Sequence, residues 1–223
     1  MRHGSVDYFR ADGSPVHPHT VPLNADGRMQ ADAAGALIRQ CGVRFDKVIV
    51  SGLNRTVETA QRVLAAAGIE LPLETEPALE EIRGGKLADI PPDEVEAAFL
   101  GAFTAGLESQ RFLGGESIGE LLDRVLPAFD RILVRDDWTN LLLVLHGGVN
   151  RALLARAMTG SRSFFGRMEQ LPACMNIIDV GRNDDLVVRF VNLAPTQWLH
   201  QHEHMTTMEK LLAQYLRLDA QSR

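Results

Sequence analysis

The chain has 223 residues, of which 45% are hydrophobic and 23% are charged, and this composition excludes a disordered protein. Its formal net charge of -6 excludes the broad basic surface on which non-specific nucleic-acid binding depends. The sequence has no run of about 18 apolar residues that could cross a membrane, and residues 1–5 lack the apolar core of a secretory signal. Only Cys41 and Cys174 are cysteines, which excludes a disulfide framework. We therefore expect a cytoplasmic protein in a reducing compartment, with neither nucleic acid nor a membrane as partner.

The first half of the chain alternates an apolar run with helical patterns. Residues 47–50 are β-branched and predict a buried strand. Apolar residues at helical spacing over 54–67 predict a helix that ends before Gly68. A longer helix is predicted over 117–134, and Pro127 should kink or divide it, because proline cannot donate a backbone hydrogen bond.

The second half continues the alternation. Residues 141–145 are apolar on both faces and predict a central strand, which a helix over 149–158 follows directly. Residues 176–180 and 186–191 predict two strands of a hairpin, and a last helix is expected over 205–218.

This order of elements predicts an α/β fold with a mostly parallel sheet covered by helices on both faces. We expect one domain over residues 1–223, since the sequence contains no clear linker. Residues 84–115 contain two adjacent prolines and several glycines but no strong strand pattern. We interpret them as a helical excursion from the sheet.

Polar side chains suited to phosphate follow two of the predicted strands. One strand leads into a helix with Arg55 in its first turn, and the other leads into His146, Gly147 and Gly148. Both segments lie at helix N-termini, where free backbone N–H groups favour an anion, and ligands of open α/β sheets bind beyond the carboxyl ends of strands.

The start of the chain adds Arg2 and His3 to these segments. Together they offer two guanidiniums and two imidazoles, enough to neutralise a phosphate that carries about -1.5 to -2 charges. The sequence therefore predicts an anion site for phosphate.

These motifs resemble, in identity and order, those of the histidine phosphatase superfamily, the phosphoglycerate-mutase-like group. The matching segments are Arg2-His3-Gly4, Pro22-Leu23-Asn24-x-x-Gly27-x-x-Gln30-Ala31, Ser51-x-Leu53-x-Arg55-x-x-x-Thr59-Ala60, Leu79-x-Glu81, Gly114-Gly115-Glu116-Ser117, Arg124-Val125 and His146-Gly147-Gly148-Val149-x-Arg151. The resemblance covers almost the whole chain and implies a three-layer α/β/α sandwich.

The resemblance also implies roles for the residues in these motifs. His3 would be the nucleophile that becomes a phosphohistidine, and His146 would assist in the catalytic site. Arg2, Arg55, His146 and Gly147 would bind the phosphoryl group. Arginine cannot lose its charge at working pH, and neutral imidazole is a competent nucleophile, so these residue types suit the chemistry. A fixed cationic pocket of this kind needs no metal and no cofactor.

The resemblance assigns the general acid to Glu81, which would protonate the leaving oxygen and then act as base toward water. Glu80, its neighbour, is the alternative. The segment also departs from the family pattern, because Gly84-Gly85 stands where an aromatic residue usually precedes the glycine.

Other histidines carry weaker signals. His200, His202 and His204 surround the start of the last predicted helix and are interpreted as solvated or as part of a substrate rim, with a metal site as the alternative. His17 and His19 flank a proline in a loop that follows Gly4 and are interpreted as loop residues that could line the pocket.

One departure concerns the fold. The family's first motif follows a central apolar strand, whereas only Met1 precedes Arg2 here. We therefore expect a sheet whose first strand is missing or truncated.

We predict a metal-independent phosphomonoester hydrolase that acts on a small phosphorylated metabolite through a phosphohistidine. A phosphoglycerate mutase is the alternative within catalysis, but residues 84–115 contain only Lys86 and Arg111 as cations for a second phosphate. A non-catalytic phosphate-binding member of the family is the alternative from another class. Self-association as a homodimer is left open, and the identity of the metabolite is not readable from the sequence.

Overall fold

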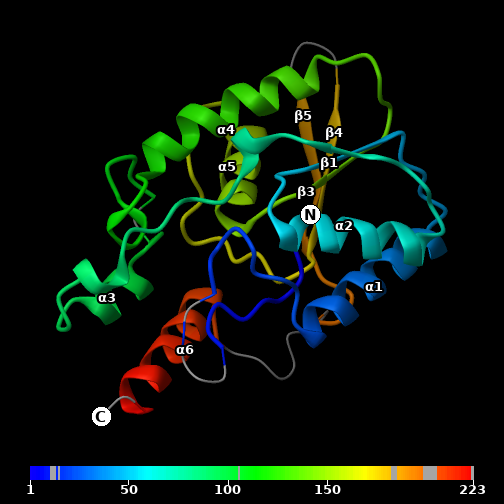
Figure 1. The fold of residues 1–223 in the computed structure, drawn as a ribbon. Helices are drawn as coiled ribbons and strands as arrows, with labels where there is room; N and C mark the ends of the chain where they lie inside the picture. The colour runs from blue at the N-terminus through cyan, green and yellow to red at the C-terminus, as the bar shows by residue number, and fades with distance from the viewer. Residues whose placement is uncertain (11–13, 15, 105, 182–184, 198–204, 222–223) are drawn as a thin grey trace.

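The computed structural model describes residues 1–10, 14, 16–104, 106–181, 185–197 and 205–221, with side chains up to residue 216 in the last segment. Its centre is a parallel sheet of three strands, in which β1 (Lys47–Val50) lies between β2 (Leu73–Thr75) and β3 (Leu141–Val144). An antiparallel pair, β4 (Met175–Val180) and β5 (Leu186–Leu193), forms a second sheet beside it (Figure 1). The strands predicted at these places are confirmed, and β2 was not foreseen.

Side chains of the central strand β1 point alternately to the two faces of the sheet, and helices cover both faces. Val48 and Val50 face one apolar cluster and Ile49 faces the other, because successive side chains of a strand point to opposite faces. The helices of the first face are α1 (Ala25–Gln40) and α2 (Asn54–Ala67); those of the second are α4 (Ile118–Leu133) and α5 (Gly147–Thr159). The predicted three-layer α/β/α arrangement is therefore present (Figure 1).

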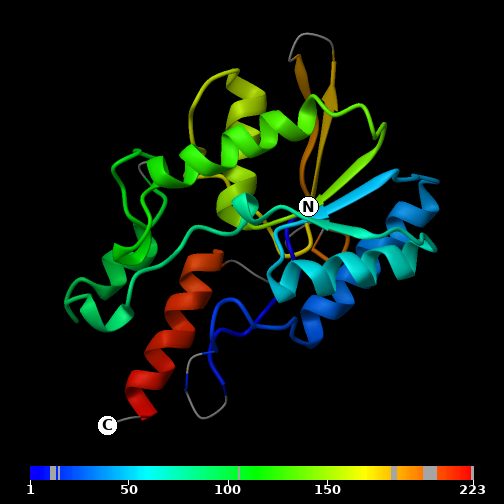
Figure 2. The same ribbon diagram turned by 45° about the horizontal axis from the view of Figure 1, so that its top comes forward.

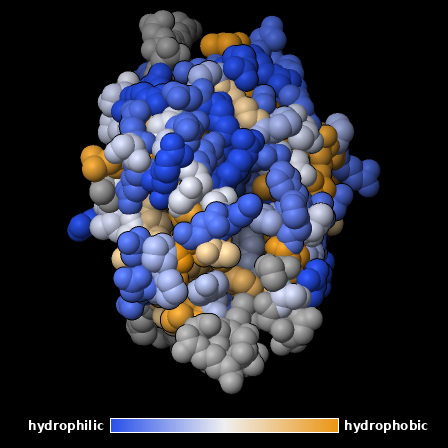
Figure 3. Space-filling view, turned by 60° about the vertical axis from the view of Figure 1, so that its left-hand side comes forward, coloured by the Kyte–Doolittle hydropathy of each residue, from blue (hydrophilic) through white to orange (hydrophobic). Residues whose placement is uncertain are grey.

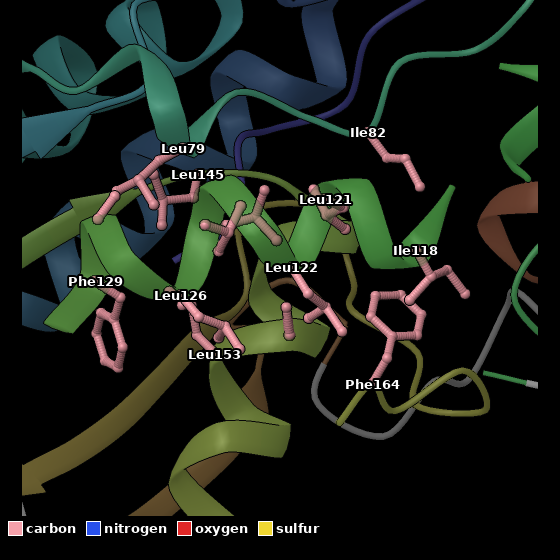
Figure 4. Close-up of a cluster of buried hydrophobic side chains, with 14 of the residues drawn as sticks. Leu79, Ile82, Ile118, Leu121, Leu122, Leu126, Phe129, Leu145, Leu153 and Phe164 are labelled. Atoms are coloured by element: carbon pink, nitrogen blue, oxygen red, sulfur yellow. The ribbon is translucent and has the colours of Figure 1, made fainter. Parts of the chain in front are cut away.

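The helix α4 supplies most of the second cluster. Leu121, Leu122 and Leu126 point from α4 toward Leu153 of α5 and toward the sheet (Figure 4). Ser117 begins the helix with a capping box that it shares with Glu120, so the predicted start is correct within one residue.

The prediction that Pro127 could divide this helix is wrong. The helix runs without a break from Ile118 to Leu133 although Pro127 lies inside it. One backbone hydrogen bond is lost at the proline, but buried side chains before and after it, including Val125 and Phe129, hold both halves against the same core.

The first residues of the chain take the place of a strand between the two sheets. On one side the backbone N–H of His3 donates to Leu145 O (2.9 Å), and Leu145 N–H donates to Met1 O (2.8 Å). On the other side Arg2 N–H donates to Cys174 O (3.0 Å), just before β4. Arg2 and Leu145 form an isolated parallel bridge.

Outside these layers the chain forms short helices and one long helix. The described residues of 84–115 contain no named strand and hold η2 (Leu87–Asp89), α3 (Val95–Leu100) and η3 (Phe112–Gly114). A further short turn, η1 (Pro77–Leu79), precedes them.

The long helix is α6 (Thr207–Gln221), which lies beside the N-terminal loop and α3 rather than against the sheet (Figure 2). Within the described residues, no helix is both long enough and apolar enough to cross a membrane.

Candidate active site

Three chain segments meet at the carboxyl end of the parallel sheet. Arg55 lies in the first turn of α2, directly after β1, and His146 is the N-cap of α5, directly after β3. The bridge between Arg2 and Leu145 places His3 beside the end of β3. The topology therefore brings together the residues that the sequence predicted for one site, as expected for parallel strands.

The ring of His3 is held in one tautomer by two neighbours. Its Nδ1 lies 2.7 Å from the carbonyl oxygen of Gly4, and a carbonyl can only accept, so Nδ1 carries the proton. Its Nε2 accepts a hydrogen bond from Nε of Arg55 at 3.3 Å. The lone pair of His3 is therefore on Nε2, on the side of the arginine.

Burial disfavours the charged form of both histidines of the site. Burial lowers the pKa of His3 well below its usual value, and the positive charges of Arg55 and Arg2 lower it further. The pKa of His146 is likewise lowered, first by burial and then by Arg55 and its other cationic neighbours. A neutral His3 keeps its lone pair available for attack, because protonation would remove it.

His146 lies behind His3 rather than on the wall of the cavity. The two ring centroids are 5.3 Å apart, and His146 is fully buried. Its Nε2 is hydrogen-bonded to the hydroxyl of Ser51 at 2.8 Å, whereas its Nδ1 has no partner among the described residues. An unpartnered buried nitrogen is costly in a folded protein.

Arg2 connects the site to the last helix. Its Nη1 donates to the carbonyl of Gln170 and, at 2.9 Å, to Oγ1 of Thr207, the first residue of α6. The Thr207 hydroxyl in turn donates to Glu169 at 2.7 Å. Nε of Arg2 is buried and has no partner among the described residues, so this arginine still has a donor to offer.

The carboxylate of Glu81 lies at the N-terminus of α5. Both of its oxygens are 3.1 Å from the backbone nitrogen of Gly148, which donates to them, and Oε1 also accepts from Ile82 N–H. Glu80 also lines the cavity, but its carboxylate pairs with Arg83 at 3.6 Å. The structure therefore brings Glu81, and not Glu80, against the glycines that follow His146.

Arg124 of α4 holds the segment that carries Glu81. Its guanidinium donates to the carbonyl oxygens of Ala78, Glu80 and Glu81 at 2.8, 2.6 and 3.0 Å. Glu116 accepts two further hydrogen bonds from the same guanidinium, at 2.7 and 2.8 Å. Arg124 is thus a positioning residue for the Glu81 segment, and its charge is balanced by Glu116.

These groups open into one cavity of about 490 Å³. Of the predicted site residues, the cavity is lined by Arg2, His3, Arg55, Glu81 and Gly147. His17 and His19, interpreted as loop residues, also contribute to its wall. The size is within the range of small-molecule sites.

The described residues contain no group of three His, Cys, Asp or Glu side chains that could hold a metal ion. The cluster of His200, His202 and His204 lies outside the described residues.

Several residues that complete the site have contacts that could not be predicted from the sequence. Ser51 and Arg124 stood inside recognised motifs, so their positions were known, but their contacts to His146 and to the Glu81 segment were not. Thr207 carried no signal, since only the folded chain brings α6 to Arg2.

The lowered pKa values predict that stability falls when the pH drops below about 6.5. In that range the unfolded chain takes up protons at His3 and His146 while the folded chain does not. Each histidine should remove about 1.4 kcal/mol of unfolding free energy per pH unit, down to its folded pKa. Urea unfolding of the wild type and of His3→Asn/His146→Asn, from pH 7.5 to pH 5, measures this effect. Equal slopes in both proteins would contradict it.

Comparison with known proteins places the chain in a family. Residues 1–193 match the model of the histidine phosphatase superfamily, branch 1. Over 150 residues the chain is 32% identical to the probable phosphoglycerate mutase GpmB of Salmonella paratyphi A, which covers 66% of this chain and 67% of that protein. Among solved structures, the α-ribazole phosphatase of Shigella flexneri superposes with a TM-score of 0.67 at 26% identity, over 86% of this chain and 94% of that one.

A mycobacterial glucosyl-3-phosphoglycerate phosphatase, solved in complex with VO3, has the same fold. Its TM-score is 0.66 at 23% identity, and the match covers 86% of this chain and 96% of that one. The family match extends from the Arg2-His3-Gly4 segment through β5 and so includes every element of the sheets. The chain belongs to the histidine phosphatase superfamily, branch 1.

Proposed function

We propose that this protein hydrolyses phosphomonoesters of small molecules through a phosphohistidine on His3, without a metal ion. The observation that carries the proposal is the geometry at His3. Its Nδ1 lies 2.7 Å from the Gly4 carbonyl, which leaves the lone pair on Nε2, and Nε2 meets Arg55 Nε at 3.3 Å in a cavity that Arg2 and Arg55 also line. The similarity to an α-ribazole phosphatase supports phosphatase activity.

In the first step, Nε2 of His3 attacks phosphorus as the bond to the ester oxygen breaks. The phosphoryl oxygens replace Nε2 as acceptors of the hydrogen bond from Arg55 Nε–H. They also accept a hydrogen bond from Nε–H of Arg2, which has no partner among the described residues. Nδ1 of His3 keeps its proton and donates it in a hydrogen bond to the carbonyl oxygen of Gly4. This hydrogen bond stabilises the positive charge that develops on the ring. Fixed cations of this kind lower the barrier of phosphoryl transfer mainly by positioning and charge stabilisation.

Glu81 supplies the proton that the leaving oxygen needs. The proton passes from its carboxyl group to the departing alkoxide, and the carboxylate then removes a proton from water. The oxygen of this water forms the new bond to phosphorus while the bond to His3 breaks, which releases inorganic phosphate and restores the neutral imidazole. The distance of 3.1 Å from Glu81 to Gly148 at the start of α5 supports this place for the acid.

Phosphoglycerate mutase activity is the second candidate, favoured by the similarity to GpmB. A mutase must retain a second phosphate or a carboxylate by means of further cations. Among the described residues that line the cavity, Arg83 and Arg151 are the remaining arginines, and they pair with Glu80 and Glu169 at 3.6 Å. This pairing favours hydrolysis over mutase activity.

Labelling with a ³²P phosphate donor tests the nucleophile. His3→Asn should eliminate the acid-labile phosphoenzyme but should still bind vanadate, since the arginines remain. His146→Ala should retain some label and should bind vanadate more weakly, because it removes the buried imidazole that packs beside His3. Label on His3→Asn would show that another residue is the nucleophile. Wild type that binds vanadate and never labels would favour a non-catalytic binding protein.

Leaving-group dependence tests the acid. Glu81→Gln should slow hydrolysis of an alkyl phosphate by about a hundredfold to ten-thousandfold and affect an activated aryl phosphate far less, because general acid catalysis contributes that much when the leaving group is poor. Glu80→Gln is the matched control, as its carboxylate faces Arg83. The reverse result, with only Glu80→Gln impaired, would move the acid by one residue.

The glycine beside Glu81 provides an independent test. In Gly148→Ala the added Cβ would lie 2.5 Å from Oε1 of Glu81, so the carboxylate must move away from α5. We expect hydrolysis of an alkyl phosphate to fall about tenfold to hundredfold, a partial loss of the acid's contribution. The melting temperature should change little, because the displaced atoms are the end of a flexible side chain. Unchanged alkyl phosphate hydrolysis would contradict the assigned position of the acid.

A further inference from the structure

The cavity has two ends of different character. One end holds Arg2, His3 and Arg55, whereas the other is formed by six large apolar side chains from four segments of the chain. These are Phe9, Phe99, Phe103, Phe112, Met208 and Leu211. On the face of the molecule that carries α3 and α6, apolar side chains are gathered among hydrophilic ones (Figure 3).

The apolar end is built and held by its own packing. Phe103 stacks on Phe112 with ring centroids 5.1 Å apart, and Phe99 stacks on Tyr215 at 5.7 Å. Phe99 is fully buried, and with Leu212 it belongs to a cluster of buried side chains separate from the two cores beside the sheet. The aromatic wall is therefore preformed, and its shape does not depend on a ligand.

Charges at this end do not suit an anionic leaving group. Arg151 lies over the ring of Phe103, 4.7 Å from its centroid, and pairs at 3.6 Å with Glu169, which also lies 4.0 Å from Arg2. Arg83 pairs with Glu80, which itself lines the cavity as a carboxylate. No unpaired arginine or lysine remains among the described residues of this wall, so a carboxylate or a second phosphate would be desolvated without compensation.

We propose that the natural substrate is the phosphomonoester of an uncharged, largely apolar alcohol, whose carbon skeleton occupies the chamber between α3, η3 and α6. This inference rests on the proposed phosphatase function, since it names the leaving group of that reaction. Burial of apolar surface is favourable in proportion to its area, so each methylene that enters the chamber strengthens binding in the transition state.

A series of n-alkyl phosphates tests the proposal, because these esters have leaving groups of similar acidity and differ only in apolar length. From ethyl to hexyl phosphate, kcat/KM should rise about threefold per methylene, or roughly eightyfold in total. 3-Phosphoglycerate, which carries a carboxylate, should be a poorer substrate than ethyl phosphate. A flat series, or a preference for 3-phosphoglycerate, would overturn the proposal.

Two variants of α6 test whether this helix causes the dependence of kcat/KM on alkyl chain length. Leu211 lines the chamber, whereas Leu216 is 49% exposed and lies outside it. In Leu211→Asn the ratio of hexyl to ethyl phosphate kcat/KM should fall about tenfold, and in Leu216→Asn it should stay at the wild-type value. Far-ultraviolet circular dichroism of both variants checks that α6 is intact. Equal ratios in two folded variants would overturn the assignment of α6 to the substrate wall.

Failure of the underlying function gives a different result. If no phosphomonoester is hydrolysed and His3 takes no ³²P label, the proposed phosphatase activity is wrong. If all esters are hydrolysed at rates independent of chain length and His3 is labelled, the phosphatase function stands and the apolar substrate class is wrong.

Discussion

The hydrogen bond between Nδ1 of His3 and the carbonyl of Gly4 is the interaction on which the site depends. It fixes the tautomer that leaves Nε2 with a lone pair, and it requires the backbone at Gly4 to stay in place. Gly4 N–H donates to Thr59 of α2 at 3.1 Å, and a side chain at Gly4 would collide with the backbone of Gly27 in α1. The helices of one face of the sheet therefore orient His3, the proposed nucleophile, through contacts that only glycine allows.

Unpaired positive charge lies beside His3, whereas the charge of Arg151, elsewhere on the cavity wall, is paired. At the phosphoryl end, His3 and His146 are kept neutral, and a buried donor of Arg2 stays without a partner, so the pocket holds positive charge that an anion can neutralise. At the other end, Arg151 is balanced by Glu169. Unpaired charge buried in a protein is costly, so its location beside His3 supports the proposed place for the phosphate.

How much the sequence could predict differs between elements. Strands with β-branched or apolar runs were predicted almost to the residue, as was α2. The helix α1 was missed because its buried face consists largely of small or polar residues, among them Gly27, Gln30 and Ala34, and so has little apolar periodicity. The motifs gave the identity of the site residues. They could not distinguish Glu81 from Glu80 by chemistry, since that depends on which carboxylate reaches the start of α5.

Contacts of α6 could not be predicted because they depend on the tertiary fold alone. Through Thr207, the first residue of α6 is bonded to Arg2, the same side chain that faces the phosphoryl site. Through Met208 and Leu211, one turn of that helix forms part of the apolar wall. Because a helix is stiff over a single turn, the position of Arg2 also sets the position of the wall. The Arg2–Thr207 hydrogen bond, between side chains about two hundred residues apart in sequence, therefore links the proposed phosphoryl site to the proposed leaving-group chamber.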